Sequence, residues 1–85
     1  MNIIQEINNV NDKFATRGSK LRIEKRGEKL NIRGSLPSKK NKNNLSVQRI
    51  SLGLKADFNG LEEAKKKLQL ITLQLELNQF NWVNW

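Results

Sequence analysis

The chain has 85 residues, a net charge of +8 and an apolar fraction of 36%, which suits one small domain with an economical core. It contains no cysteine and no histidine, so disulfide bridges, thiolate nucleophiles and the commonest zinc ligands are excluded. No apolar run approaches the roughly 20 residues of a membrane span, and the N-terminus lacks the basic start and apolar stretch of a signal peptide.

Residues 3–15 are predicted to form a helix, because apolar residues recur in them at spacings of four, three and four. These residues are Ile3, Ile7, Val10 and Phe14. Asn2 is positioned to cap the helix at its start, and Gly18 suits a left-handed helix terminus at its end.

The apolar period then changes to two, which is typical of strands. We expect strands at 20–26 and 29–35, joined by a tight turn in which Gly27 tolerates a positive φ. Pro37 cannot donate to a ladder and marks the end of the second strand, and a long polar loop leads to a third strand at 46–54. The residues expected to face the core are Leu21, Ile23, Leu30, Ile32, Ile50, Leu52 and Leu54.

A second helix is predicted at 60–77, where Asn59 and Glu62 resemble a capping box. Its apolar stripe consists of Leu61, Ala64, Leu68, Ile71 and Leu75, and is widened by Leu70, Leu73 and Leu77. A stripe of this width covers a sheet or packs between two elements. The expected fold class is therefore α+β: a three-stranded antiparallel sheet packed against a C-terminal helix, with an additional N-terminal helix.

The aromatic segment 80–85, FNWVNW, has two interpretations. Aromatic side chains can stack on bases, but no basic residue is interleaved with these. Core packing, or the start of a following domain, is the better interpretation. We therefore expect one domain over 1–79 and the start of a linker at 80–85.

Positive charge is concentrated in the middle of the chain. Residues 17–55 hold twelve basic and two acidic residues, whereas the remainder holds four basic and six acidic residues. Such asymmetry is typical of a protein that binds a polyanion. A solvated surface is the alternative, but solubility does not require charge to be concentrated in one segment. The lysines at 65–67 do fit solvation, because Glu62 and Glu63 lie within a helical turn of them.

The strand face opposite the predicted core carries one arginine on each strand. This face holds Lys20, Arg22, Glu24, Asn31, Arg33, Val47, Arg49 and Ser51. Arginine can fork onto a guanine edge and asparagine onto adenine, which makes the candidate base-reading residues Arg22, Asn31, Arg33, Arg49 and Ser51. The candidate phosphate contacts, where charge matters more than position, are Lys20, Lys25, Lys29, Lys39, Lys40, Lys42 and Lys55. Any one of these residues is explained equally well by an ordinary solvated sheet face, but three arginines on one side favour nucleic acid.

Catalysis has little support in this sequence. The chain has no histidine, cysteine or tyrosine, and no acidic pair suited to acid–base chemistry. The two RGS segments, at 17–19 and 33–35, contain one glycine each and are not phosphate loops. We expect no active site, cofactor, metal or small-molecule ligand in this chain.

The order of several segments resembles a known family. EKRGEKLNIRGSLP, a basic polar loop, QRISLGL, GLEEAKKK and a closing FNW resemble the N-terminal segment of phage and mobile-element integrases of the tyrosine recombinase family. The resemblance covers about residues 2–85, and no single motif in it is diagnostic.

The resemblance implies an arm-type domain that binds double-stranded DNA in the bacterial cytoplasm, at the nucleoid, with its sheet in the major groove. It also implies that 80–85 lead to a core-binding domain. The catalytic arginines, histidine and tyrosine of that family lie in a C-terminal domain, so DNA integration or recombination would belong to the parent protein, which could oligomerise on DNA. The helix at 3–15 is an addition to the family pattern.

Two other functions compete with duplex binding. Small sheets also bind single-stranded RNA, usually through exposed aromatic side chains that stack on bases, but the expected face has none. The apolar stripes of the two helices could instead serve a protein partner or a homodimer.

Overall fold

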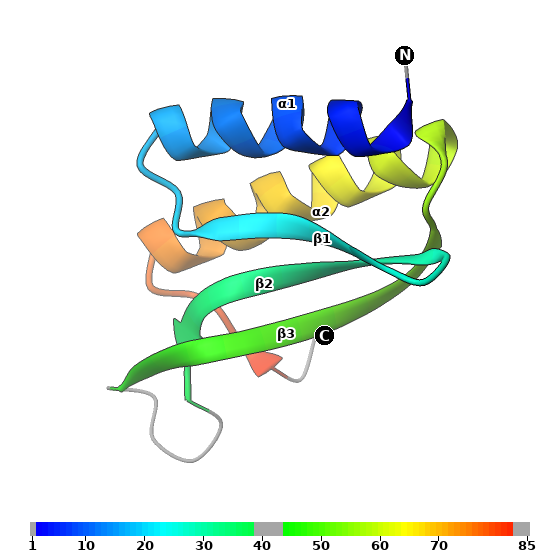
Figure 1. Ribbon diagram of the computed structural model, residues 1–85. Coiled ribbons are helices and arrows are strands. Elements are labelled where there is room, and N and C mark those ends of the chain that lie inside the picture. The colour runs from blue at the N-terminus through cyan, green and yellow to red at the C-terminus, as the bar shows by residue number, and fades with distance from the viewer. Residues whose placement is uncertain (1, 39–43, 83–85) are drawn as a thin grey trace.

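The computed structural model describes residues 2–38 and 44–82, and it confirms the predicted α+β class (Figure 1). Within these ranges the sheet is antiparallel with the strand order β1-β2-β3. The elements are α1 (Ile3–Thr16), β1 (Leu21–Arg26), β2 (Lys29–Pro37), β3 (Leu45–Lys55) and α2 (Phe58–Glu76). Each lies within a few residues of its predicted position.

The ends of α1 are fixed by the residues that the sequence indicates. The Oδ1 atom of Asn2 accepts a hydrogen bond from the backbone N–H of Gln5 at 2.8 Å. At the other end, Gly18 has a φ of +85°, and the N–H of Ser19 donates to the carbonyl oxygen of Phe14 at 3.0 Å. This left-handed glycine ends the helix and turns the chain into β1.

The start of α2 differs from the prediction. The N-cap is Asp57, whose Oδ1 atom accepts a hydrogen bond from the N–H of Gly60 at 2.7 Å. The expected capping box at Asn59 is therefore wrong, because the helix is capped by Asp57 and already begins at Phe58, which places Asn59 inside it.

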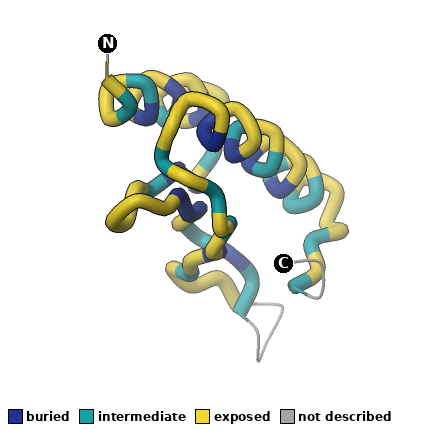
Figure 2. Tube along the Cα trace, turned by 90° about the vertical axis from the view of Figure 1, so that its right-hand side faces the viewer, coloured by how far each residue is buried: buried dark blue, intermediate teal, exposed yellow. Residues whose placement is uncertain are grey.

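The two helices share one hydrophobic core with the sheet. Figure 1 shows α2 behind the strands, and α2 contacts all three of them, whereas α1 runs beside β1 and also touches α2. The buried segments of the helices and strands lie between these layers (Figure 2). The largest fully buried side chains are Ile23, Leu30, Ile32, Leu36, Leu68 and Ile71. No described helix is long and apolar enough to cross a membrane.

Only part of the wide apolar stripe of α2 belongs to this core. Its predicted central residues are buried, apart from half-buried Leu75. Leu70, Leu73 and Leu77 instead remain 47%, 50% and 55% exposed. The expectation that they widen the packed face is wrong, because a single sheet covers only one side of the helix.

The additional helix α1 closes one edge of the sheet. The Nδ2 atom of Asn11 donates to the carbonyl oxygen of Ile23 at 3.0 Å, and the N–H of Ile23 donates to Oδ1 of Asn11 at 2.7 Å. This side-chain amide occupies the place that a neighbouring strand would take beside β1. It also fixes the backbone between Arg22 and Glu24, two residues of the outer sheet face.

The hairpin and a bulge set the register of the strands. Arg26 pairs with Lys29 across a tight turn, in which Gly27 has a φ of +58°. Between β2 and β3 the register shifts: Asn31 pairs with Ser51, whereas Leu30 pairs with Leu54. Leu52 and Gly53 are the extra residues on β3, and Gly53 has a φ of +67°. Because two residues are inserted, the side chains keep their alternation and Lys55 comes to lie opposite Lys29.

The first aromatic residues of the C-terminal segment pack on the domain. Trp82 donates from Nε1 to the carbonyl oxygen of Pro37 at 2.7 Å. The rings of Phe80 and Trp82 meet edge to face, with centroids 5.2 Å apart, and both residues pack against the core. These contacts agree with the core-packing interpretation of the two residues, while 83–85 lie outside the described ranges.

Candidate nucleic-acid interface

A row of three arginines crosses the sheet on the face that the helices leave open. Arg22 on β1 pairs in register with Arg33 on β2, and Arg33 pairs with Arg49 on β3. All three are exposed. The alternation predicted that these residues share a face, and the register adds that they lie directly opposite one another. We call them the arginine row.

Like charges placed directly opposite on neighbouring strands destabilise a sheet, and Glu24 compensates two of these charges. Its Oε1 atom lies 2.9 Å from Nε of Arg49, and its Oε2 atom lies 3.5 Å from Nη1 of Arg33. Partial burial raises the pKa of Glu24, but hydrogen bonding and the positive charge of Arg49, together with those of Arg33, outweigh this effect. The pKa of the carboxyl group therefore lies below its ordinary value of 4.5.

A second basic row crosses the same face next to the hairpin turn. Arg26 on β1 pairs with Lys29 on β2, and Lys29 pairs with Lys55 on β3. All three are exposed, and no ion pair holds any of them within the described ranges. We call them the basic row. The sequence-based choice of site residues omitted Arg26, although the alternation through Arg22 and Glu24 placed it on this face.

The row between these two is polar. Glu24 pairs in register with Asn31, and Asn31 pairs with Ser51. The bridge from Glu24 on β1 to Arg49 on β3 passes over β2, and Asn31 is only 7% exposed. The expectation that Asn31 is open to a base edge is therefore wrong for this structure, whereas Ser51 is exposed.

Of the remaining candidate lysines, the structure describes two, which lie near opposite ends of β1. Lys20 is exposed just before β1. Lys25 is also exposed, and its Nζ atom donates to the carbonyl oxygen of Gly27 at 2.7 Å, which holds it at the hairpin turn. Lys39, Lys40 and Lys42 lie outside the described residues.

The N-terminal helix forms a wall beside this face. A shallow hollow of about 690 Å³ lies between α1 and the outer side of the strands. Ile4, Asn8 and Asn11 line it from the helix, and the strands contribute Arg22, Arg33 and Val47 among others. Val47 is 65% exposed, so an apolar surface accompanies the arginines. Helix α1 thus both contributes to the core and borders the outer face.

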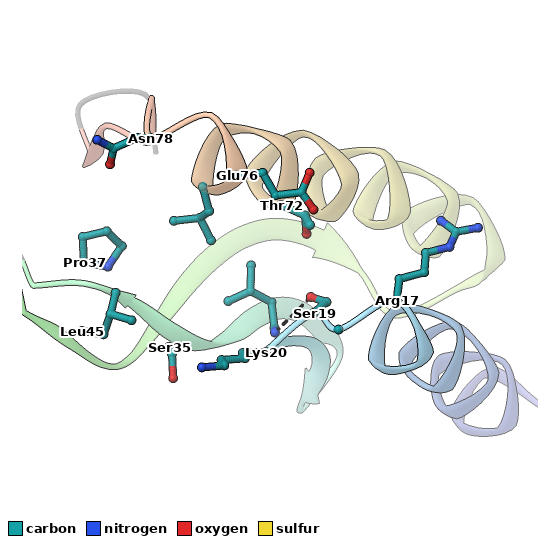
Figure 3. A pocket seen from close by; sticks show the side chains of 12 residues that line it. Arg17, Ser19, Lys20, Ser35, Pro37, Leu45, Thr72, Glu76 and Asn78 are labelled. Atoms are coloured by element: carbon teal, nitrogen blue, oxygen red, sulfur yellow. Dashed lines mark hydrogen bonds between the residues drawn. The ribbon is translucent and has the colours of Figure 1, made fainter.

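A separate hollow of about 320 Å³ lies away from this face, at the end of the sheet where α1 leads into β1 (Figure 3). Its lining is mixed: Leu21, Leu45 and Leu75 provide apolar surface, while Arg17 and Glu76 are charged. The hydroxyls that border it have no histidine or cysteine beside them, because the chain contains neither. Among the described residues, no group of three or more potential metal ligands occurs there or elsewhere.

Comparison with known proteins places the chain in a family. The family model of the XisA/XisC N-terminal domain matches residues 1–85, which is the full length of the sequence. No curated protein and no solved structure gives a significant match.

Proposed function

The chain belongs to the XisA/XisC N-terminal domain family, a recombination-associated DNA-binding domain, and from this we propose that it binds double-stranded DNA with its open sheet face in the major groove. In this proposal it is the N-terminal domain of a site-specific integrase or recombinase. The tyrosine recombinase family, whose arm-type domain the sequence resembles, is the proposed class of parent protein.

The observation that carries the proposal is the arrangement of cations in two rows on one exposed face. The two rows are four residues apart along β1, from Arg22 to Arg26, which corresponds to about 13 Å in a strand. The major groove is about 12 Å wide and admits a two-stranded ribbon. At this separation, the arginine row can contact base edges while the basic row contacts backbone phosphates.

The two rows suit different contacts. Arginine presents a planar fork that matches the two acceptors of guanine, which makes Arg22, Arg33 and Arg49 the proposed base-reading residues, with Ser51 beside them. The basic row has no acidic partner in the described ranges, and lysine is a flexible point charge. The basic row is therefore suited to phosphates, whose recognition depends on charge more than on position.

The proposal gives this chain a binding role and leaves the chemistry to another domain. The chain has no tyrosine, histidine or cysteine, so strand cleavage and rejoining would need residues of the parent protein. We propose a cytoplasmic, nucleoid-associated location for that protein, as follows from binding chromosomal and mobile-element DNA in bacteria. Assembly of several copies on DNA is part of the same proposal.

A salt titration of binding to duplex DNA tests the proposal. Each neutralised phosphate contributes about −0.9 to the slope of log affinity against log salt, so contacts from the basic row alone predict a slope near −2.7. Single-stranded RNA of the same length is the matched control. No binding to any duplex would contradict the proposal.

Two measurements test the competing functions, which are RNA binding and protein interaction. Tighter binding to single-stranded RNA than to the duplex would favour an RNA-binding module, although no described residue on the outer face of the strands is aromatic. Sedimentation measures the oligomeric state of the protein. A stable dimer without affinity for DNA would favour a protein-interaction domain, served by the exposed leucines of α2.

A further inference from the structure

Glu24 is the one acidic side chain on the outer face of the described strands, and it binds two arginines without using all of their donors. A guanidinium group has five N–H donors. Glu24 contacts Nε of Arg49 and Nη1 of Arg33. In the described part of the chain, no hydrogen bond is made by the two terminal nitrogens of Arg49. The same holds for Nε and Nη2 of Arg33. The side chain of Arg49 is 37% exposed and that of Arg33 is 49% exposed, so these donors are open to a ligand.

Charge and hydrogen-bond donors serve different parts of DNA recognition. Attraction to phosphates depends on net positive charge and is independent of sequence. Recognition of a guanine edge depends on two donors held in a fixed geometry. The carboxylate cancels half of the charge of Arg33 and Arg49 and leaves a donor pair on each. It therefore weakens contact with phosphates more than contact with base edges.

We infer that Glu24 is a specificity-determining residue of the DNA-binding face, which holds Arg33 and Arg49 for base edges and reduces their attraction to phosphates of any sequence. This inference rests on the proposed function. The carboxylate is suited to the role because its contacts with both arginines join three strands through side chains alone.

The variant Glu24→Gln tests the inference, because it keeps the size of the side chain and removes its charge. A duplex is first selected with the wild-type protein from a pool of random sequence. Affinities for this duplex and for a shuffled version are then measured against salt concentration. For Glu24→Gln we expect binding to the shuffled duplex to tighten about five- to tenfold near 0.1 M salt, with a slope steeper by about 0.9, as one additional phosphate contact requires.

We also expect the ratio of the two affinities to fall at least about fivefold, which is the lower end of the discrimination given by one bidentate base contact. Glu28→Gln is the matched control. Glu28 lies in the exposed hairpin turn and makes no ion pair within the described ranges. Its variant changes the net charge equally, so both affinities should rise together and their ratio should stay constant.

Two outcomes separate failure of the inference from failure of the proposed function. If the wild-type protein enriches no duplex, the proposed function fails and this inference fails with it. If the wild-type protein enriches a duplex and Glu24→Gln keeps the wild-type ratio, or changes it only as Glu28→Gln does, Glu24 has no role in specificity.

A measurement on the wild-type protein covers the case in which Glu24→Gln does not fold. The Nε–H signal of Arg49 in a nuclear magnetic resonance spectrum reports its bond to the carboxylate. We expect this signal to remain protected from exchange in the complex with the selected duplex. Loss of protection there would show that Arg49 leaves Glu24 in order to bind DNA, which would overturn the inference.

Discussion

The arginine row and the basic row each contain three cations directly opposite one another on the same sheet face, but their surroundings differ. Glu24 holds two members of the arginine row, and Asn11 fixes the backbone of β1 next to it. The basic row lies beside the hairpin turn, and no acidic side chain in the described ranges pairs with it. The difference shows how one sheet can present ordered donors in one place and uncompensated charge in another.

Removing the charge of the basic row should have the largest effect. For the variant Arg26→Gln/Lys29→Gln/Lys55→Gln, we expect duplex affinity to fall by two to three orders of magnitude near 0.1 M salt. The salt slope should become shallower by about 2.7, equally for all sequences. The matched control is Lys65→Gln/Lys66→Gln/Lys67→Gln, which removes the same charge from α2. An equal loss in this control would mean that only net charge matters.

Replacing a single arginine of the arginine row should reduce the preference for one DNA sequence over another. We expect Arg33→Ala or Arg49→Ala to cost about 1–3 kcal/mol of discrimination between the preferred and a substituted base pair. Lys40→Ala should instead weaken binding to all duplexes alike, because its proposed partner is a phosphate. Competition binding with single-base-pair variants measures both effects. Equal losses on every sequence for all three variants would contradict base reading.

Loosening β1 should affect the arginine row and spare the basic row. Asn11→Ala removes two hydrogen bonds to Ile23, and leaving partly buried backbone groups unpaired costs about 1–3 kcal/mol of unfolding free energy. Urea denaturation measures this loss. We also expect faster amide exchange near Arg22 and unchanged exchange near Lys55. Equally faster exchange near Arg22 and near Lys55 would show that the loss of these hydrogen bonds destabilises both rows.

Acid should loosen the arginine row through Glu24, and this is the smallest expected effect. Because the folded-state pKa of Glu24 lies below its ordinary value of 4.5, its contribution to stability is present above that value. It is lost as the pH falls through the lower folded-state pKa. We expect this part of the acid dependence of the unfolding free energy to be absent in Glu24→Gln. Identical acid titrations of both proteins would show that the carboxylate contributes nothing to stability.

Several parts of the fold were predictable because they follow from local patterns. The four-three-four spacing of apolar residues predicted α1, and the period of two predicted the hairpin and the shared face of Arg22, Arg33 and Arg49. The concentration of basic residues in 17–55 indicated a polyanion. Side-chain alternation in a strand is a property of backbone geometry, so it can be read without knowing what the strand packs against.

Other parts depended on contacts between residues far apart in the chain. Glu24 and Arg49 are 25 positions apart, and no local pattern indicates which arginine a carboxylate will reach. Lys55 lies opposite Lys29 only because two residues bulge from β3, and Asn31 is buried although its position in the alternation is outward. Asn11 gave no signal as the partner of Ile23, because a polar residue on a helix is ordinarily solvated.

The sequence by itself therefore determined the elements, their order, the side of the sheet that bears arginine and the concentration of positive charge in 17–55. The tertiary structure alone decided the register, the pairing of Glu24 with two arginines, the second row of cations and the closure of β1 by α1. The physical reason is that periodicity is fixed by the geometry of each element. Register and ion pairing are fixed only when turns, a bulge and the packing of α1 and α2 bring separate elements together.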